Sequence, residues 1–242
     1  MESPSRVASA AGGLGGFAAT LFTLGLSGSY IGLVPGHIGF RIYAGGLLLG
    51  LIGLLVGLAG LWHTRASNAR RGRGRAMSGV GIGLVLVGVV VVNLGSLNNV
   101  PPINDITTNP DDPPTFTRAG QLEANRHRDL GYPGESFASQ QHTAYPDLEP
   151  IRLNAPQETV FRKAEAAATA LGWEITHRDA KLGVIEATDT SEIFKFVDDV
   201  VIRIRSASGR SVVDVRSKSR VGLGDLGANA ARIRAFREKL GS

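Results

Sequence analysis

An arginine-rich loop between two long apolar stretches restricts what this chain can form more than any other feature. Apolar stretches of membrane-spanning length, residues 42–62 and 77–97, lie on either side of it. Basic residues near the ends of membrane helices are retained on the cytoplasmic side. We therefore predict that both stretches span a membrane and that the loop is cytoplasmic. Its topogenic residues are Arg65, Arg70, Arg71, Arg73 and Arg75.

A third apolar run, residues 7–34, precedes the other two and carries no charge. It exceeds the apolar core of about 7 to 15 residues found in cleaved signal peptides, so we predict a retained first helix. Pro35 and Gly36 are expected to break the chain before a tight connection over residues 37–41. Arg6 favours a cytoplasmic N-terminus, whereas Arg41 in that connection is a contrary signal. With three spans, the residues after 97 are expected in the periplasm, anchored in a bacterial inner (cytoplasmic) membrane.

Glycines four residues apart recur in the second and third stretches. Small residues at this spacing let helices approach closely in lipid. They predict a compact three-helix bundle, with a homodimer formed through these faces as the alternative. No Asp, Glu or Lys lies within the three stretches, which argues against a transporter. The glycines are Gly46, Gly50, Gly53, Gly57, Gly79 and Gly83.

The basic surplus of the chain belongs to its membrane half. Residues 1–97 hold seven basic residues and one acidic residue, net +6, whereas residues 98–242 hold nineteen and twenty, net −1. A nucleic-acid-binding protein needs a basic face on a folded module, so we expect no nucleic-acid partner and regard the bilayer as the partner of the arginine loop. The absence of cysteine excludes disulfides and thiolate metal sites, and no cofactor is expected.

Residues 98–150, called the collar below, hold eight of the eleven prolines and show no sustained helical or strand period. Large apolar residues such as Phe116, Leu130 and Phe137 recur in the collar, which is not the composition of a disordered segment. We therefore predict an ordered, irregular segment that wraps over the domain that follows it.

Several stretches resemble the bacterial and plastid family catalogued as domain of unknown function 1499. In the collar they are PPINDITT (101–108), DPPTF (112–116) and YP (145–146). Later in the chain they are DDVVIR (198–203), RSKSRVG (216–222) and DLGANAARI (225–233). The resemblance covers nearly all of residues 98–240, after the three predicted transmembrane helices. It implies a domain boundary, but no activity and no site residues.

Residues 151–242 show the periodicities of an α+β domain. A helix with Asn154 as its N-cap extends to Leu171, and a second helix begins at an N-cap, Asp225. Between them we expect four antiparallel strands, at about 173–177, 183–190, 198–205 and 211–219. The predicted organisation is a membrane domain (1–97), the collar (98–150) and a two-layer domain (151–242) with two helices on one sheet face.

Two polar clusters are candidate sites. The first is in the collar, at Asn104, Asp105, Thr107 and Thr108, where oxygen ligands could hold a cation but also suit turns. The second is an anion or partner face on the last two strands. Because the collar is net −5 and residues 151–242 net +4, the collar could instead cover that face. This basic face consists of Arg203, Arg205, Arg216, Lys218 and Arg220.

Catalytic motifs are weak in this sequence. The five histidines lack the H-E-x-x-H spacing, and there is no G-x-S-x-G. We therefore expect a non-catalytic domain that binds an envelope component or partner protein. One alternative is an envelope hydrolase or transferase that uses collar polar groups, such as His127 or His142 near Ser136 or Ser139. Another is an anionic lipid-binding domain that uses Arg216, Lys218 and Arg220.

Overall fold

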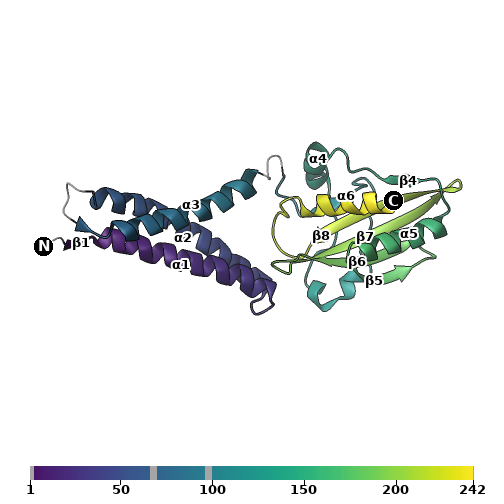
Figure 1. Ribbon diagram of the computed structural model, residues 1–242. Helices are drawn as coiled ribbons and strands as arrows, with labels where there is room; N and C mark the ends of the chain where they lie inside the picture. Colours follow the sequence, from purple (N-terminus) through teal and green to yellow (C-terminus); the bar gives the residue numbers. More distant parts are fainter. Residues whose placement is uncertain (1–2, 66–69, 96–99, 242) are drawn as a thin grey trace. The chain divides into compact units, whose positions relative to one another are not determined.

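The computed structural model describes residues 3–65, 70–95 and 100–241 (Figure 1). The chain forms two compact units. One comprises residues 1–98 with the short segment 192–195, and the other comprises residues 99–191 and 196–242. Three long apolar helices precede a domain with an antiparallel sheet and helices, so the predicted α+β fold class is confirmed.

Three helices of membrane-spanning length and composition form the first unit: α1 (Arg6–Tyr30), α2 (Gly36–His63) and α3 (Arg73–Gly95). The first helix ends earlier than predicted because the chain turns at Gly32, which has a φ of +77°. The second begins directly after Pro35, so the predicted connection over residues 37–41 is wrong. Proline suits a helix start because its missing amide would have no partner there.

The regularly spaced glycines pack inside this bundle. A Cβ atom on Gly46 would lie 2.5 Å from the amide nitrogen of Phe22, and one on Gly83 would lie 2.7 Å from the carbonyl oxygen of Gly50. The backbones of neighbouring helices are therefore too close to admit a side chain at these positions. Contacts within one chain account for the predicted compact bundle.

Replacement of Gly46 by valine should destabilise the bundle by roughly 1–3 kcal/mol, because the added atoms overlap the backbone of α1. Thermal unfolding of the full chain in detergent, followed by far-UV circular dichroism, measures this loss. The control is Gly45→Val, next to it in α2, where a Cβ meets no atom within 4 Å. Equal melting temperatures for the two variants would contradict the packing argument.

Residues 3–4 and residues 70–71 lie at the same end of the bundle. β1 (Ser3–Pro4) pairs in parallel with β2 (Arg70–Arg71), and the Ser5 amide donates to the Arg71 carbonyl oxygen at 2.9 Å. The turn between α1 and α2 lies at the opposite end. Because the three helices alternate in direction, α3 also ends there.

A six-stranded antiparallel sheet forms the centre of the second unit (Figure 1). Its order is β3-β8-β7-β6-β5, and β4 also pairs with β8. The short strands β3 and β4 share one edge of β8, since β3 pairs with residues 216–218 and β4 with residues 211–213. The strands are β3 (Asp105–Thr107), β4 (Ile151–Leu153), β5 (Glu174–Asp179), β6 (Val184–Thr190), β7 (Val197–Ala207) and β8 (Arg210–Ser219).

Two helices, α5 (Gln157–Ala170) and α6 (Ala228–Gly241), cover one face of this sheet (Figure 1). Alternate residues of the central strands, such as Ile202 and Val215, point into the apolar core between the layers. The Trp173 and Phe236 rings stack there with centroids 5.4 Å apart. The other alternate residues lie on the opposite face, beneath the collar.

Two predictions about the second unit need correction. The sheet has six strands rather than four, because β3 and β4 are three residues long and too short to show an alternating pattern. The collar is not irregular throughout, since it supplies β3, two 3₁₀ turns (η2, Ala119–Gln121; η3, Glu123–Asn125) and α4 (Glu135–Ala144).

Neither predicted cap residue occupies the N-cap position of its helix. Pro156, not Asn154, occupies the N-cap position of α5, and no side chain caps that helix. α6 begins at Ala228, so Asp225 lies two residues before the N-cap position, although its carboxylate accepts from the Gly227 and Asn229 amides at 2.8 Å each. Burial raises the pKa of this carboxyl group, although the two amide bonds oppose the shift.

Candidate functional site

A buried carboxylate of the collar is paired with two of the predicted basic residues. Asp105 accepts hydrogen bonds from Nε and Nη2 of Arg216 at 2.8 Å each, and from Nζ of Lys218 at 2.7 Å. Arg216, only 1 % exposed, also donates to the carbonyl oxygens of Pro114 and Leu130. These bonds join β8 to three separate stretches of the collar.

Two aromatic rings complete the surroundings of Arg216. The centre of its guanidinium group lies 4.9 Å from the ring centroid of Phe116 and 5.5 Å from that of Tyr132. Burial raises the pKa of Tyr132 to about 12, and the nearby Asp105 carboxylate adds to the shift. Arg216 is therefore enclosed by the collar rather than presented to an external anion.

The other basic residues on this face are also paired with buried carboxylates. Asp199 accepts from Arg220 at 2.7 Å and from Arg128 of the collar at 3.0 Å. Asp214 accepts from Arg203 and Arg205, each at 2.7 Å. Both carboxylates are fully buried, and such charges are tolerated only when paired and hydrogen-bonded.

The collar turn that begins at Thr117 binds a fourth carboxylate, that of Glu186 on β6. This carboxylate is 0 % exposed and accepts hydrogen bonds from the amides of Thr117, Arg118 and Ala119 at 2.7, 2.9 and 2.6 Å. The Thr117 hydroxyl donates to the same group at 2.5 Å. Three successive amides thus surround one carboxylate, as they do at an anion-binding turn.

The five predicted basic residues therefore pair within the chain, and the collar covers the face on which they lie. The predicted collar site has a similar structural role. The Asn104 side chain donates to the Gly222 carbonyl, Thr107 exchanges two hydrogen bonds with the Gln141 side chain, and the Thr108 hydroxyl accepts from the Val215 amide. Among residues 3–65, 70–95 and 100–241, no three His, Asp or Glu side chains gather in a way that could hold a metal ion.

The topogenic arginines lie in the first unit, around the end of α2 and the start of α3. The Arg65 guanidinium lies over the Trp62 ring, 4.4 Å from its centroid, and Arg75 donates to the Ser9 hydroxyl at 3.1 Å. Arg70 and Arg71 form β2, and Arg73 is the first residue of α3.

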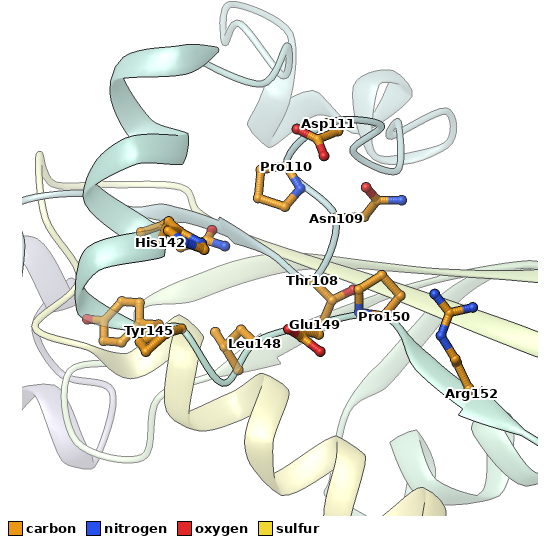
Figure 2. Close-up of a pocket in the computed structure, with 12 residues that line it drawn as sticks. Thr108, Asn109, Pro110, Asp111, His142, Tyr145, Leu148, Glu149, Pro150 and Arg152 are labelled. Atoms are coloured by element: carbon orange, nitrogen blue, oxygen red, sulfur yellow. The ribbon is translucent and has the colours of Figure 1, made fainter.

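A cleft of about 350 Å³ lies where the collar turns after β3, beside the end of α4 and the start of β4. Figure 2 shows His142 of α4 on one side of the opening and Arg152 of β4 on the other, with Pro110 and Asp111 on the loop between them. The lining residues are Thr108, Asn109, Pro110, Asp111, Gln141, His142, Tyr145, Pro146, Leu148, Glu149, Pro150 and Arg152.

Four charged or titratable side chains reach the cleft without a partner. Asp111, His142, Glu149 and Arg152 are all exposed, and within the part of the chain that the structure describes their side chains make no hydrogen bond or ion pair. The collar face, by contrast, pairs every one of its buried carboxylates. Because these polar groups line one concave surface, the cleft is the candidate binding site of this domain.

Hydrogen bonds and strand pairing connect the segments that form the rear of the cleft. Gln141, 1 % exposed, holds the backbone of Thr107 through bonds of 2.9 and 2.6 Å. Asn109 accepts from the Asp112 amide at 3.2 Å and thereby closes the turn of the loop. The backbone pairing of Arg152 with Val212 of β8 fixes the opposite wall. The cleft is thus shaped before any ligand arrives.

Asp147 anchors the segment that supplies Leu148 and Glu149 to the cleft. Its carboxylate accepts from Arg234 at 2.7 Å and from Arg237 at 3.2 Å, both on α6. These bonds, led by the Arg234 hydrogen bond, lower the pKa of Asp147 to about 2. The lining segment is therefore tied to the helix layer.

Asp147→Asn should cost about 1 kcal/mol at pH 7, less than the full pKa difference implies, because the Asp147 side chain is 43 % exposed and screened by solvent. Since the folded pKa is lowered, the contribution is present above pH 3.8 and lost as the pH falls toward 2. Denaturant unfolding of wild type and variant at a series of pH values tests this. A gap that does not narrow at low pH would contradict the assignment.

The predicted Ser and His groups do not form a catalytic arrangement at the cleft. His142 lines it, whereas His127, Ser136 and Ser139 do not. Among the described residues, no hydrogen bond joins either histidine to either serine hydroxyl; the Ser136 and Ser139 carbonyls instead accept bonds within α4.

Sequence analysis singled out His142 but missed Glu149 and Arg152. Glu149 and Arg152 reach the cleft because β4 pairs with the outer edge of β8. The three residues of β4 are too few to show a strand pattern, so the sequence did not predict this pairing. Pro150 indicated an irregular segment, but it did not indicate that the residues near it line a cleft.

Comparison with known protein families gives one match. The family model described as "Protein of unknown function (DUF1499)" matches residues 105–240, a range that includes every residue that lines the cleft. No curated protein matches this chain.

Proposed function

The chain belongs to the DUF1499 family of proteins of unknown function, and from that premise we propose that it is a membrane-anchored, non-catalytic binding protein. In this proposal the three helices hold the chain in a bacterial inner membrane, and the cleft of the α+β domain binds an envelope component. The observation that carries the binding role is the convergence of four unpartnered side chains on one preformed cleft.

The proposed orientation places the N-terminus in the cytoplasm and the α+β domain in the periplasm. The pairing of residues 3–4 with residues 70–71 supports it, because both then lie at the arginine-rich end of the bundle. The chain has no native cysteine, so Ser67→Cys and Ser208→Cys can be labelled selectively. A membrane-impermeant thiol reagent should label only Ser208→Cys in intact spheroplasts, and the reverse pattern would overturn the orientation.

The cleft suits a ligand that carries both an amino group and an acidic group. Asp111 and Glu149 supply carboxylates, whereas Arg152 supplies a planar guanidinium that binds carboxylate or phosphate through two parallel hydrogen bonds. His142 adds an imidazole ring, whose nitrogens can donate or accept a hydrogen bond. A peptide-bearing envelope polymer such as peptidoglycan has this mixture of charges.

Cosedimentation with purified peptidoglycan sacculi tests the proposal. The full chain in detergent should pellet with sacculi, and Arg152→Ala and Glu149→Ala should each reduce the pelleted fraction. The matched control is Arg162→Ala, an exposed arginine of α5 that does not line the cleft. Unchanged pelleting of both cleft variants would refute the role of the cleft.

A second candidate is an envelope hydrolase or transferase, and the specific observation in its favour is the unpartnered His142 in the cleft. His142→Ala is the informative variant, because Asp105→Ala would remove a buried ion pair and test stability instead. Full rescue of a deletion phenotype by His142→Ala would count against an enzyme, and loss of rescue by a folded variant would favour one.

Self-association in the membrane is a further part of the proposal. Gly81 and Gly88 of α3 meet no atom of the chain within 4 Å of an added Cβ, so this face could admit a second copy. Disulfide crosslinking of Gly88→Cys in membranes should then give a covalent dimer. Ala76→Cys, at a fully buried position of α3, should not, and equal crosslinking of the two variants would contradict this face.

A further inference from the structure

The loop between β8 and α6 exposes three large apolar side chains within six residues. Val221, Leu223 and Leu226 are 49, 90 and 66 % exposed. Single exposed apolar residues are ordinary, but a concentration of them marks an interaction surface. Leu226 also has a φ of +56°, a left-handed conformation that residues other than glycine rarely adopt.

Hydrogen bonds hold this loop in shape, so the outward side chains do not result from a loose segment. The Asn104 side chain donates to the Gly222 carbonyl at 2.6 Å, and the Asp225 amide donates to the Ile103 carbonyl at 3.2 Å. The Asp225 carboxylate accepts two amides at the start of α6 and is thereby used inside the loop. The tip is left with apolar groups and no free charge.

The loop lies beside the point at which the chain enters the domain. A Cβ on Gly224 would lie 3.2 Å from the Cα of Pro102, and one on Gly227 would lie 3.7 Å from the side chain of Val100. Only five residue steps separate Val100 from Gly95, the last residue of α3, and five residues reach at most about 18 Å. The covalent chain therefore limits how far the loop can move from the membrane surface at which α3 emerges.

We propose that Val221, Leu223 and Leu226 insert into the interfacial region of the same bilayer that holds the three helices. The inference rests on the proposed membrane anchorage. A lipid interface fits the chemistry, because apolar side chains gain free energy by leaving water and the tip brings no charge with it. The short tether favours the bilayer over a distant protein partner, because the membrane is always within reach.

Site-specific fluorescence in the full chain, reconstituted into vesicles of pure phospholipid, tests this inference. A single cysteine is introduced by Leu223→Cys, by Leu182→Cys or by Val85→Cys and labelled with an environment-sensitive dye. Leu182 is the matched control, a leucine 70 % exposed in the β5–β6 turn at the other end of the sheet. Val85, 67 % exposed in the middle of α3, reports whether the helices are in the bilayer.

The dye at position 223 should emit at shorter wavelength than the dye at 182 and lose intensity to lipids that carry a nitroxide near the headgroup. Equal emission at 223 and 182, with both quenched by aqueous iodide, would overturn loop insertion while quenching at 85 by deep nitroxide lipids still supports the anchor. If the dye at 85 also resists lipid quenching, the membrane anchorage itself is wrong. Because the vesicles hold no other protein, a protein-binding loop would behave like position 182.

Discussion

Replacement of Arg216 by alanine is expected to lower the free energy of unfolding of the α+β domain by about 3–5 kcal/mol, because it leaves a carboxylate buried without its main partner. Asp105 is 0 % exposed and would keep only the single Lys218 bond of 2.7 Å. The carbonyls of Pro114 and Leu130 would lose their donor as well. A domain of this size is stable by only about 5–15 kcal/mol, so the variant should approach the unfolding threshold.

Denaturant unfolding of the full chain in detergent measures this loss. Trp173 is buried in the domain core, and the only other tryptophan is Trp62, so a Trp62→Phe background gives a domain-specific fluorescence signal. The control is Arg205→Ala on the same face, where the side chain is 45 % exposed and Asp214 keeps Arg203. We expect a change below about 1 kcal/mol there.

A double variant separates the ion pair from the packing around it. Asp105→Asn combined with Arg216→Met removes both charges and keeps much of the buried volume, so it should be more stable than Arg216→Ala alone. If Arg216→Ala lowers the free energy of unfolding by less than about 1 kcal/mol, the Asp105–Arg216 pair does not stabilise the domain to the expected extent.

The sequence was sufficient for the elements that have enough residues to show a period. Three long apolar runs, two helices with apolar faces and four alternating strands all exist close to their expected places. Some helix ends differ from their predicted positions because a single residue sets them. The second helix, for example, begins immediately after Pro35. The strands β3 and β4 were missed, because three residues satisfy any period.

The charge composition predicted that the collar covers the basic face of the sheet, but it did not predict which residues form ion pairs. A net charge of −5 in the collar and +4 after it suggested an acidic segment on a basic face. The structure reverses this in places: Arg128 of the collar binds Asp199 of the sheet, and collar amides bind Glu186. Opposite charges do not specify partners, since each pairing also depends on strand register and on the course of the backbone.

That course is also why the cleft could not be found in the sequence. His142 and Arg152 belong to different elements, and only the docking of α4 and β4 around the loop at Asn109 places them on one opening. The unpaired state of these side chains is visible only after every neighbouring charge has been assigned a partner. Side chains that line a candidate site without pairing to one another leave no pattern along the sequence.

Glu186→Ala is expected to destabilise the domain by about 2–4 kcal/mol, because the amides around that carboxylate lose a charged acceptor. The Ala119 amide loses most, because Ala119 is only 3 % exposed. Its N–H cannot form a hydrogen bond with water unless the collar opens. The turn at residues 117–119 should then detach from β6 before the sheet itself unfolds, because the ladder between β6 and β7 does not depend on it.

Hydrogen exchange followed by mass spectrometry distinguishes this local opening from general destabilisation. Faster exchange should be concentrated in peptides that cover residues 117–125, with the strands still protected under native conditions. Glu174→Ala, at an exposed glutamate of the neighbouring strand β5, should leave both exchange and stability within about 0.5 kcal/mol of wild type. Glu186→Gln keeps one acceptor oxygen, but its NH₂ group faces a backbone N–H donor. Its loss of stability should therefore lie between those of Glu186→Ala and Glu174→Ala. Uniformly faster exchange across the sheet in Glu186→Ala would show that this carboxylate supports the sheet itself rather than fastening the collar to it.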